Sequence, residues 1–319
     1  MEKTPIALIV DDPSPRVFVY HEHAGKETVA DGRKIPDNVP NSFLFHFCDV
    51  VEKYRIKGKY SVVPMAGGRG RIDKGFSGFP YSEIQEWIDT VKTRLSPYFS
   101  FCPEILTHHG VIDLKTMEMQ EERESEWSFR QTAKELTPYI AFGLQLLKNV
   151  GIPATGVTSP WDFGEKNESE YAKAIAMAMD EVFGRKESWY FCRSVYRCNS
   201  DAKPWMGYSD ETHRCVAIPG TISDNIWQSM DTPDTSEEYV SRIADIYLTA
   251  DGKSGKILET LEGGGWPILT THWQSLFSNG NETGIRILAA VAERVNKHLS
   301  DRVQWMNHEE MMKEALKIL

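Results

Sequence analysis

The sequence predicts an α/β fold: one (β/α) barrel of seven or eight parallel strands, regular or distorted, that forms a single domain over residues 1–319. Two observations predict it. Short runs rich in β-branched and aromatic residues alternate with longer segments whose apolar residues recur at helical spacing. No linker rich in Pro, Ser or Gly divides the chain. The stretch 192–233 is rich in Asn, Asp, Pro, Gly and Trp, and it predicts long surface loops.

Each predicted element follows from its own pattern. The predicted strands are 6–10, 60–65, 100–106, 154–158, 189–192, 215–218, 268–271 and 302–305. The predicted helices are 42–55, 82–95, 128–150, 168–183, 236–248, 282–299 and 308–316. Ser82 with Gln85 and Thr235 with Glu238 have the spacing of capping boxes, and Gly151 follows the third helix as a C-cap glycine would.

Composition excludes several classes of protein. The net charge of -10, from 46 acidic and 36 basic residues, argues against nucleic acid or an anionic membrane surface as a partner. No apolar run is long enough to predict a transmembrane helix. The first predicted strand follows two charged residues, without a signal-peptide cleavage site. We therefore expect a cytoplasmic protein, unless the leader of an exported protein has been removed.

The cysteines do not form a recognisable framework. There are five of them, an odd number, and no close CxxC pair is present. Neither a disulfide scaffold nor a zinc ribbon fits this pattern. We expect reduced and mostly buried thiols at Cys48, Cys102, Cys192, Cys198 and Cys215.

Reactive side chains collect directly after the predicted strands. The first strand ends in Asp11 and Asp12, and a late strand ends in His272. The third strand is followed by His108 and His109. Because the carboxyl ends of parallel strands lie on one face of a barrel, we expect these side chains to converge on one pocket.

The aspartate and histidine pairs predict a metal site. One of Asp11 and Asp12 would bind a divalent ion while the other acts as a base; the alternative is a turn before a proline. Imidazole and carboxylate groups are ligands of hydrolytic zinc, so His108, His109 and Asp113 are candidate ligands, and Asp12 would complete a set of three. The alternative is a loop in which Asp113 caps a helix.

His272 is the candidate for proton transfer to a leaving group, because a buried strand would deliver it to the same pocket. A metal-ligand role is the competing hypothesis.

Candidate substrate-binding residues lie in the predicted loops. Trp161 and Trp273 would stack on a sugar ring, and Asp162 lies beside the first of them. Arg69 and Arg71, on a glycine-rich loop, would hold an anionic group of the substrate. This loop lacks the spacing and the Lys-Ser/Thr ending of a P-loop, so nucleotide binding is not expected. Trp205, Tyr208 and Trp266 are further aromatic candidates.

The order of these motifs resembles the polysaccharide deacetylase family. The likeness covers most of the barrel and is carried by LIVDD at 8–12, GKYSVVP at 58–64 and EILTH at 104–108. The resemblance implies that Asp11 is the catalytic base, that Asp12 is a metal ligand, and that His108 or His109 is another.

Two further stretches share the resemblance. GVTSPWD at 156–162 is similar to the family's third motif, with Ser159 where an arginine is expected before the proline. LTTH at 269–272 is similar to the motif that supplies the acid, here His272.

The chain departs from the family at the last metal ligand. The family has a second histidine four or five residues after the first, whereas this sequence has Ile112 or Asp113. The resemblance then implies either an Asp, His and Asp triad or the loss of the metal. One divalent ion is expected, with zinc favoured; a carboxylate-rich site shifts the preference towards manganese or another oxygen-preferring ion.

Three hypotheses about function follow. The first is a metal-dependent hydrolase that removes an acetyl or similar acyl group from a carbohydrate or a related small amide. The second is a glycoside hydrolase that uses Asp162 with Asp11 or Asp12. The third is a carbohydrate-binding protein without metal or turnover. The sequence is compatible with either a monomer or a homo-oligomer.

Overall fold

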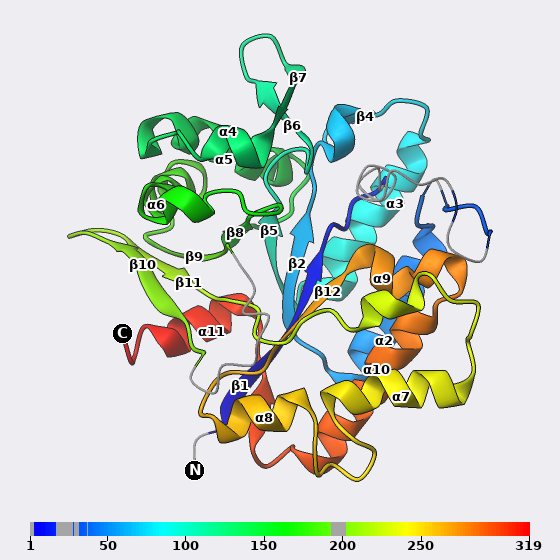
Figure 1. Cartoon of the computed structure of the whole chain (residues 1–319). Helices are drawn as coiled ribbons and strands as arrows, with labels where there is room; N and C mark the ends of the chain where they lie inside the picture. The colour runs from blue at the N-terminus through cyan, green and yellow to red at the C-terminus, as the bar shows by residue number, and fades with distance from the viewer. Residues whose placement is uncertain (1–2, 17–27, 29–31, 37, 193–201) are drawn as a thin grey trace.

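The computed structural model describes residues 3–16, 28, 32–36, 38–192 and 202–319. Helices surround centrally placed strands (Figure 1). The strands are β1 (Thr4–Asp11), β2 (Gly58–Val62), β3 (Gly70–Arg71), β4 (Gly75–Phe76), β5 (Phe99–Pro103), β6 (Gly110–Asp113), β7 (Glu118–Arg123), β8 (Gly156–Thr158), β9 (Glu187–Phe191), β10 (Trp205–Ser209), β11 (Arg214–Ala217), β12 (Ile268–His272) and β13 (Val303–Trp305). The α-helices are α2 (Asn41–Tyr54), α3 (Tyr81–Thr90), α4 (Glu124–Ser128), α5 (Ala133–Asn149), α6 (Glu168–Phe183), α7 (Glu237–Tyr247), α8 (Lys256–Glu262), α9 (Trp273–Phe277), α10 (Thr283–His298) and α11 (His308–Ala315).

Two sheets hold the parallel strands. The first has the order β12-β1-β2-β5, with β13 also paired to β1, and all of its ladders are parallel. The second has the order β10-β11-β9-β8, in which only the β10-β11 ladder is antiparallel. Single parallel bridges join the end of β5 to the region of β8, Phe101 to Ala154 and Glu104 to Thr158, and another joins Leu269 of β12 to Ile222 in the segment after β11. The fold is therefore mixed α/β and built on parallel strands, as the sequence predicts.

The central strand β1 packs against a hydrophobic cluster on each of its faces. Its sequence is apolar from Pro5 to Val10 and every one of these residues is buried, which is typical of an interior parallel strand. Successive side chains point to opposite faces, so Leu8 joins the larger cluster beneath the helices while Ile9 joins a smaller one. The smaller cluster also holds residues of β5, β9, β11, β12 and α11. Strands of both sheets therefore enclose this smaller core.

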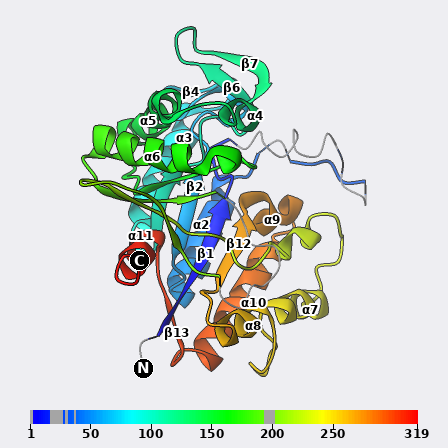
Figure 2. The same ribbon diagram turned by 60° about the vertical axis from the view of Figure 1, so that its left-hand side comes forward.

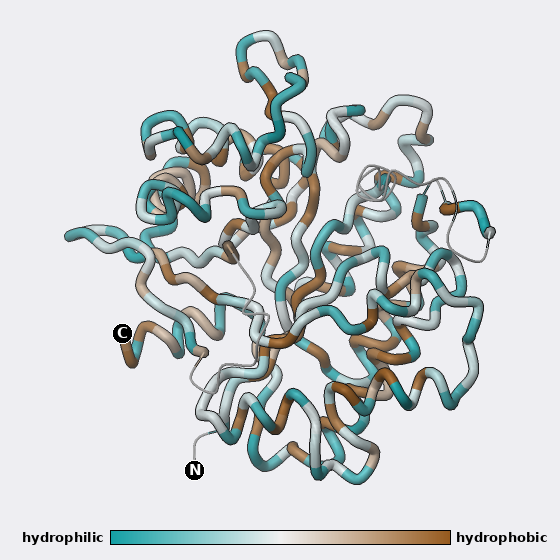
Figure 3. Tube along the Cα trace, viewed as in Figure 1, coloured by the Kyte–Doolittle hydropathy of each residue, from teal (hydrophilic) through white to brown (hydrophobic). Residues whose placement is uncertain are grey.

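Helices cover the strands from two sides. Helices α2, α7 and α10 lie together on one side, and α5 and α6 lie on the other (Figures 1 and 2). Hydrophobic residues recur along the central strands and the helices (Figure 3). None of the helices in the described ranges combines the length and the apolar character that a membrane span needs.

The predicted strands are confirmed, and some predicted helices and loops are corrected. Each of the eight predicted strands overlaps a strand of the structure. The helix predicted over 128–150 is divided between α4 and α5, and the one predicted over 82–95 continues beyond α3 as a wider π turn. The prediction of loops throughout 192–233 is wrong in part, because β10 and a short helical turn form there in addition to β11. Residues 193–201, including Cys198, lie outside the described residues, and the other four cysteines are buried.

Helix capping differs from the predicted spacing. Helix α3 starts after Pro80 without a side-chain cap, so the Ser82 capping box is wrong. Helix α7 is capped by Ser236, one residue after the predicted Thr235. Capping boxes form instead at Thr132 before α5 and at Asn307 before α11. The prediction for Gly151 is in line with its left-handed φ of 76°, directly after the C-cap of α5.

Trp273 belongs to the core, so its predicted role in stacking on a sugar is wrong. Its side chain is 1% exposed and its ring lies 4.8 Å from that of Phe43, 5.3 Å from that of Phe47 and 5.7 Å from that of Tyr60. The reason is that α9 begins at this residue, immediately after β12, and turns the indole towards α2.

We expect Trp273→Ala to lower the free energy of unfolding by about 3 to 5 kcal/mol, because it empties a large volume in a packed aromatic cluster. Trp161→Ala is the matched control: this indole is 47% exposed, and its loss is expected to cost about 1 kcal/mol or less. Urea denaturation of the two variants measures the difference. Equal losses would contradict the assignment of Trp273 to the core.

Candidate active site

A cavity of about 790 Å³ opens where the carboxyl ends of the parallel strands meet. Asp11 ends β1 and His272 ends β12, and the two residues are paired in the register of these strands. Further side chains come from the segments after β5, β8 and β9 and from residues 223–227. The lining residues are Asp11, Glu104, His108, Ser159, Trp161, Asp162, Glu165, Phe191, Cys192, Ser223, Asp224, Trp227, Thr270 and His272.

Three residues at this end of the strands have a strained backbone. Asp12, His108 and Trp161 have φ values of 70°, 58° and 51°, in the left-handed region that favours glycine. Such positions cost on the order of 1 kcal/mol each and persist where the surroundings hold them. The turn at Asp12 explains how two successive aspartates both serve one end of a strand, although strand geometry alone would point them to opposite faces.

Asp12, Glu104 and His108 form a buried cluster that could hold a metal ion. One ligand atom from each lies within 4.8 Å of the others. His108 Nε2 is 3.1 Å from Asp12 Oδ1 and 3.4 Å from Glu104 Oε1. The backbone N–H of Asp12 donates to Glu104 Oε2 at 2.8 Å, which fixes the glutamate against the first strand.

The electrostatics of this cluster favour a bound cation. Burial raises the pKa of Glu104 to about 7, and the charges of Asp12 and Asp11 add to the rise. Burial alone would lower the pKa of His108, but Asp12 and Glu104 hold it well above its usual range. A positive charge among these groups is therefore stabilising. Oxygen and nitrogen ligands about 2.1 Å from one ion lie about 3.0 to 3.4 Å apart in octahedral or tetrahedral sites, and the two distances from His108 Nε2 lie in this range.

The carboxylate of Asp11 forms an ion pair with a buried lysine. Lys59 of β2 is fully buried, and its ammonium group donates to Asp11 Oδ1, to Ser61 Oγ at 2.7 Å and to Thr158 Oγ1 at 2.9 Å. The Ser61 hydroxyl also donates to Asp11 Oδ1, at 2.9 Å. Asp11 Oδ2 accepts no hydrogen bond from the residues that the structure describes. One carboxylate oxygen of Asp11 is thus fixed, and the other is left for chemistry.

His272 is oriented by Asp224. Its Nδ1 lies 2.8 Å from Asp224 Oδ2, which also accepts the backbone N–H of His272 at 3.1 Å. The indole of Trp227 lies edge-on to the imidazole, with ring centres 5.0 Å apart. Burial alone would lower the pKa of His272, but the hydrogen bond to Asp224 and the charges of Asp12, Asp224 and Asp11 raise it to about 9. The imidazole is therefore protonated at neutral pH.

The structure brings most of the predicted site residues together. Asp11, His108, Trp161, Asp162 and His272 line the cavity. Asp12 lies beside it, in the buried cluster.

The last predicted metal ligand is wrong. Asp113 is exposed at the end of β6, and its Oδ1 accepts the backbone N–H groups of Lys115 and Thr116. It caps a turn of the β6–β7 hairpin, and Glu104 takes its place in the cluster. His109 is also outside the cluster: its backbone N–H donates to Thr107, and its neighbour His108 is the histidine that faces Asp12.

The predicted anion-binding arginines do not line the cavity. Arg71 is engaged by Asp73, with Nε and a terminal nitrogen 2.9 and 2.8 Å from the carboxylate oxygens. Arg69 is exposed on the adjacent turn and is not among the lining residues. Trp205, which donates to Glu168 from β10, and the buried Trp266 are also absent from the lining.

Sequence analysis missed three residues of this site. Glu104 precedes His108 by four residues, and a search before the histidine as well as after it would have included it. Lys59 is the one charged residue of the buried strand GKYSV, which marks a buried charge in need of a partner. Asp224 carries no such signal, because it lies in a stretch without periodicity.

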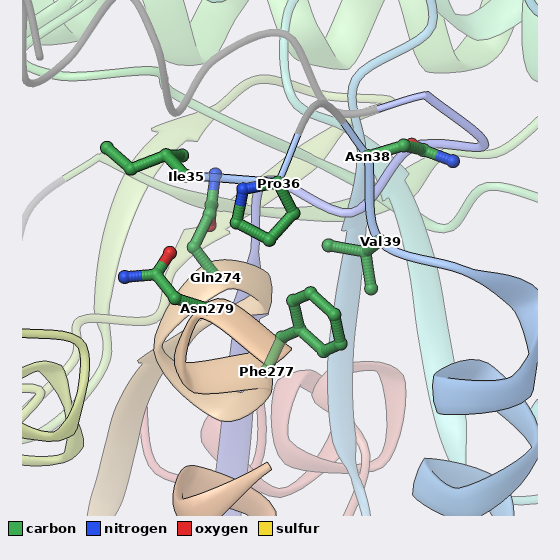
Figure 4. Close-up of a pocket in the computed structure, with 7 residues that line it drawn as sticks. All are labelled: Ile35, Pro36, Asn38, Val39, Gln274, Phe277 and Asn279. Carbon is green, nitrogen blue, oxygen red and sulfur yellow. The ribbon is translucent and has the colours of Figure 1, made fainter. Parts of the chain in front are cut away.

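A much smaller pocket lies beside α9, where Gln274 and Phe277 face residues 35, 36, 38 and 39 (Figure 4). Its volume of about 10 Å³ corresponds to roughly one water molecule. This pocket is therefore too small for a substrate.

We expect Lys59→Met to lower the free energy of unfolding by about 3 to 5 kcal/mol, because it leaves the Asp11 carboxylate buried without its cation. Adding Asp11→Asn should recover much of this loss, since the stranded charge is then removed. Urea denaturation at pH 7 measures both effects. Lys57→Met is the matched control: this partly exposed lysine pairs with Glu310, and its loss is expected to cost about 1 kcal/mol or less. Strictly additive effects in the double variant would contradict the prediction.

Comparisons with known proteins leave the family open. No family model and no curated protein matches the chain. Among solved structures, a 4-alpha-glucanotransferase from Thermococcus litoralis is similar with a TM-score of 0.46 and 10% sequence identity; the match covers 98% of this chain and 40% of that chain. This chain thus spans less than half of that enzyme's length, and similarity at this level establishes neither a common fold nor a common activity.

Proposed function

We propose that this protein is a metal-dependent hydrolase that removes an acetyl or similar acyl group from a carbohydrate or a related small amide. One observation carries the proposal: the buried cluster of Asp12, Glu104 and His108 stands beside Asp11 and His272, and these last two end neighbouring strands at one cavity. A ligand set, a base and a proton donor are therefore within reach of one substrate. The resemblance to polysaccharide deacetylases supports the same reading.

Asp12, Glu104 and His108 would hold one divalent ion. Bound there, such an ion would polarise the acyl carbonyl and make an attacking water more acidic. Two carboxylates and one imidazole form a harder donor set than the sites that zinc prefers, so manganese and other oxygen-preferring ions compete with zinc for it.

Asp11 and His272 would carry the proton transfers. Asp11 Oδ2 accepts a proton from the attacking water, while Lys59 and Ser61 hold Oδ1 in place. The pKa of His272 is raised by Asp224 and the nearby carboxylates, which favours the protonated imidazole, and His272 gives its proton to the leaving nitrogen or oxygen. Asp224 orients the imidazole and stabilises its charged form.

The walls of the cavity suit a small polar substrate with a flat apolar face. Trp161 and Trp227 supply aromatic surface, and Asp162 supplies a hydrogen-bond acceptor for hydroxyl groups. About 790 Å³ lies in the range of cavities that take small molecules.

The two sheets would form the wall of one distorted barrel around this site. Single parallel bridges join β5 to the region of β8 and β12 to the segment after β11, and residues of five strands share the smaller hydrophobic cluster inside. Helix α11 contributes Met311 and Met312 to the same cluster and would close the end opposite the cavity.

Metal content is the first test of this proposal. Protein purified without chelator or nickel should contain about one divalent ion per chain by mass spectrometry. Asp12→Ala, Glu104→Ala and His108→Ala should each lose the ion and the release of acetate from acetylated amino sugars. Asp113→Ala and His109→Ala are the matched controls and should keep both.

Two results would count against the proposal. One is wild-type protein that takes up no ion after addition of zinc or manganese; the other is full turnover by metal-free Asp12→Ala protein. New reducing ends without acetate release would instead favour cleavage of a glycosidic bond.

We expect activity to fall on the alkaline side, as the pH rises through the raised pKa of His272, because His272 loses the proton that it donates. Asp224→Asn removes the negative charge that helps to raise this pKa and leaves only a neutral amide oxygen as the acceptor. The alkaline limb of the pH profile of kcat should therefore move to lower pH by about one to three units. An alkaline limb that stays in place in Asp224→Asn would rule out His272 as the acid.

A further inference from the structure

We propose that Glu124 is the positioning residue for the metal ligand His108, a role that rests on the proposed function. Glu124 is the first residue of α4 and directly follows the β6–β7 hairpin. Its side chain is fully buried, and the residue does not line the cavity. It therefore acts on the site through the protein rather than by touching a substrate.

The Glu124 carboxylate is surrounded by hydrogen-bond donors. Oε1 accepts the backbone N–H of His108 at 2.6 Å. Oε2 accepts the hydroxyl of Tyr139 at 3.0 Å and the backbone N–H of Thr107 at 3.4 Å. The Tyr139 hydroxyl itself accepts the N–H of Ile112 at 3.1 Å, which leaves its own hydrogen for Glu124. Three converging donors suit a carboxylate, whereas an amide would turn its own N–H groups towards some of them.

A second bond closes the same loop. The backbone N–H of Glu124 donates to the carbonyl oxygen of His109 at 2.9 Å. The segment 107–109 is thus held by both the backbone and the side chain of one residue. This hold matters because His108 has a φ of 58°, a conformation that a histidine adopts only at a cost.

The hydrogen bonds from Glu124 to the segment 107–109 fix the backbone from which the His108 imidazole projects. With the backbone fixed, His108 Nε2 lies 3.1 Å from Asp12 Oδ1 and 3.4 Å from Glu104 Oε1. No lysine or arginine among the described residues pairs with Glu124, so the burial of this carboxyl group is offset by the charge of His108 and by hydrogen bonds. Those bonds converge on the segment that carries the ligand. Mutation of a residue that hydrogen-bonds to a metal ligand typically lowers the affinity of the site for its metal 10- to 100-fold.

The test is the affinity of the whole protein for Zn²⁺ and Co²⁺, measured by titration calorimetry. Glu124→Gln keeps one oxygen that can accept the His108 N–H, and Glu124→Leu keeps none. We expect the dissociation constants to rise by about 10-fold and about 100-fold, respectively. The visible absorption spectrum of bound Co²⁺ should change in both variants, because it reports the geometry of the ligands.

Two further variants keep the test decisive. Glu122→Gln is the matched control, because this glutamate of β7 faces outward to Arg130, and its loss should leave the affinity unchanged. Tyr139→Phe removes one donor to Glu124 but not the bond to His108, so it should weaken binding less than Glu124→Gln. If Glu124→Leu does not fold, Glu124→Gln and Tyr139→Phe decide the question.

The outcomes separate this inference from the proposed function. Wild-type affinity and an unchanged Co²⁺ spectrum in the folded Glu124 variants, with only a lower Tm, would make Glu124 a purely structural residue. The metal site would then stand without it. Wild-type protein that binds neither ion would overturn the proposed function and this inference together.

Discussion

The parallel pairing of β1 with both β2 and β12 is the constraint on which the rest of the structure depends. It places Asp11 opposite His272, and it brings Lys59 to the face of β2 from which it reaches Asp11. Alternate residues of β1 belong to two different hydrophobic clusters, so a shift of one residue would exchange the two faces. The hydrogen bonds and the apolar contacts of one strand therefore fix both the core and the positions of the candidate catalytic groups.

The candidate site combines two kinds of feature that lower the stability of a protein, buried charges and left-handed backbone. Charged groups are buried at Asp11, Lys59 and Glu104, and left-handed backbone occurs at Asp12 and His108. Each charge has an opposite partner or several donors, which lowers the cost of burial without abolishing it. Local violations of this kind are expected at functional sites, where a rigid and well-packed surrounding structure holds them in place.

The buried strands could be predicted from the sequence because each is a short apolar run, whereas elements with mixed faces could not. The hairpin β6–β7 is the clearest omission, since β7 reads EMQEER and is almost entirely solvated. Trp273 shows a different limit: its place after a strand suggests the pocket, but the start of α9 turns it into the core. Asp11, Asp12, His108 and His272 could be named because they directly follow strands or motifs. Asp224 could not, because a loop far away in the sequence brings it to His272.

The hairpin β6–β7 is tied at its base and projects from the body at its tip (Figure 1). Glu124 joins its last strand to His109 and His108 through two bonds, while the turn around Met117 is exposed. The hairpin is therefore fixed at its base and exposed at its tip. Lengthening the turn between β6 and β7 would add little to the entropic cost of closing this loop. Its length and outer sequence can diverge freely, so proteins of this architecture can acquire arms of different size over an unchanged centre.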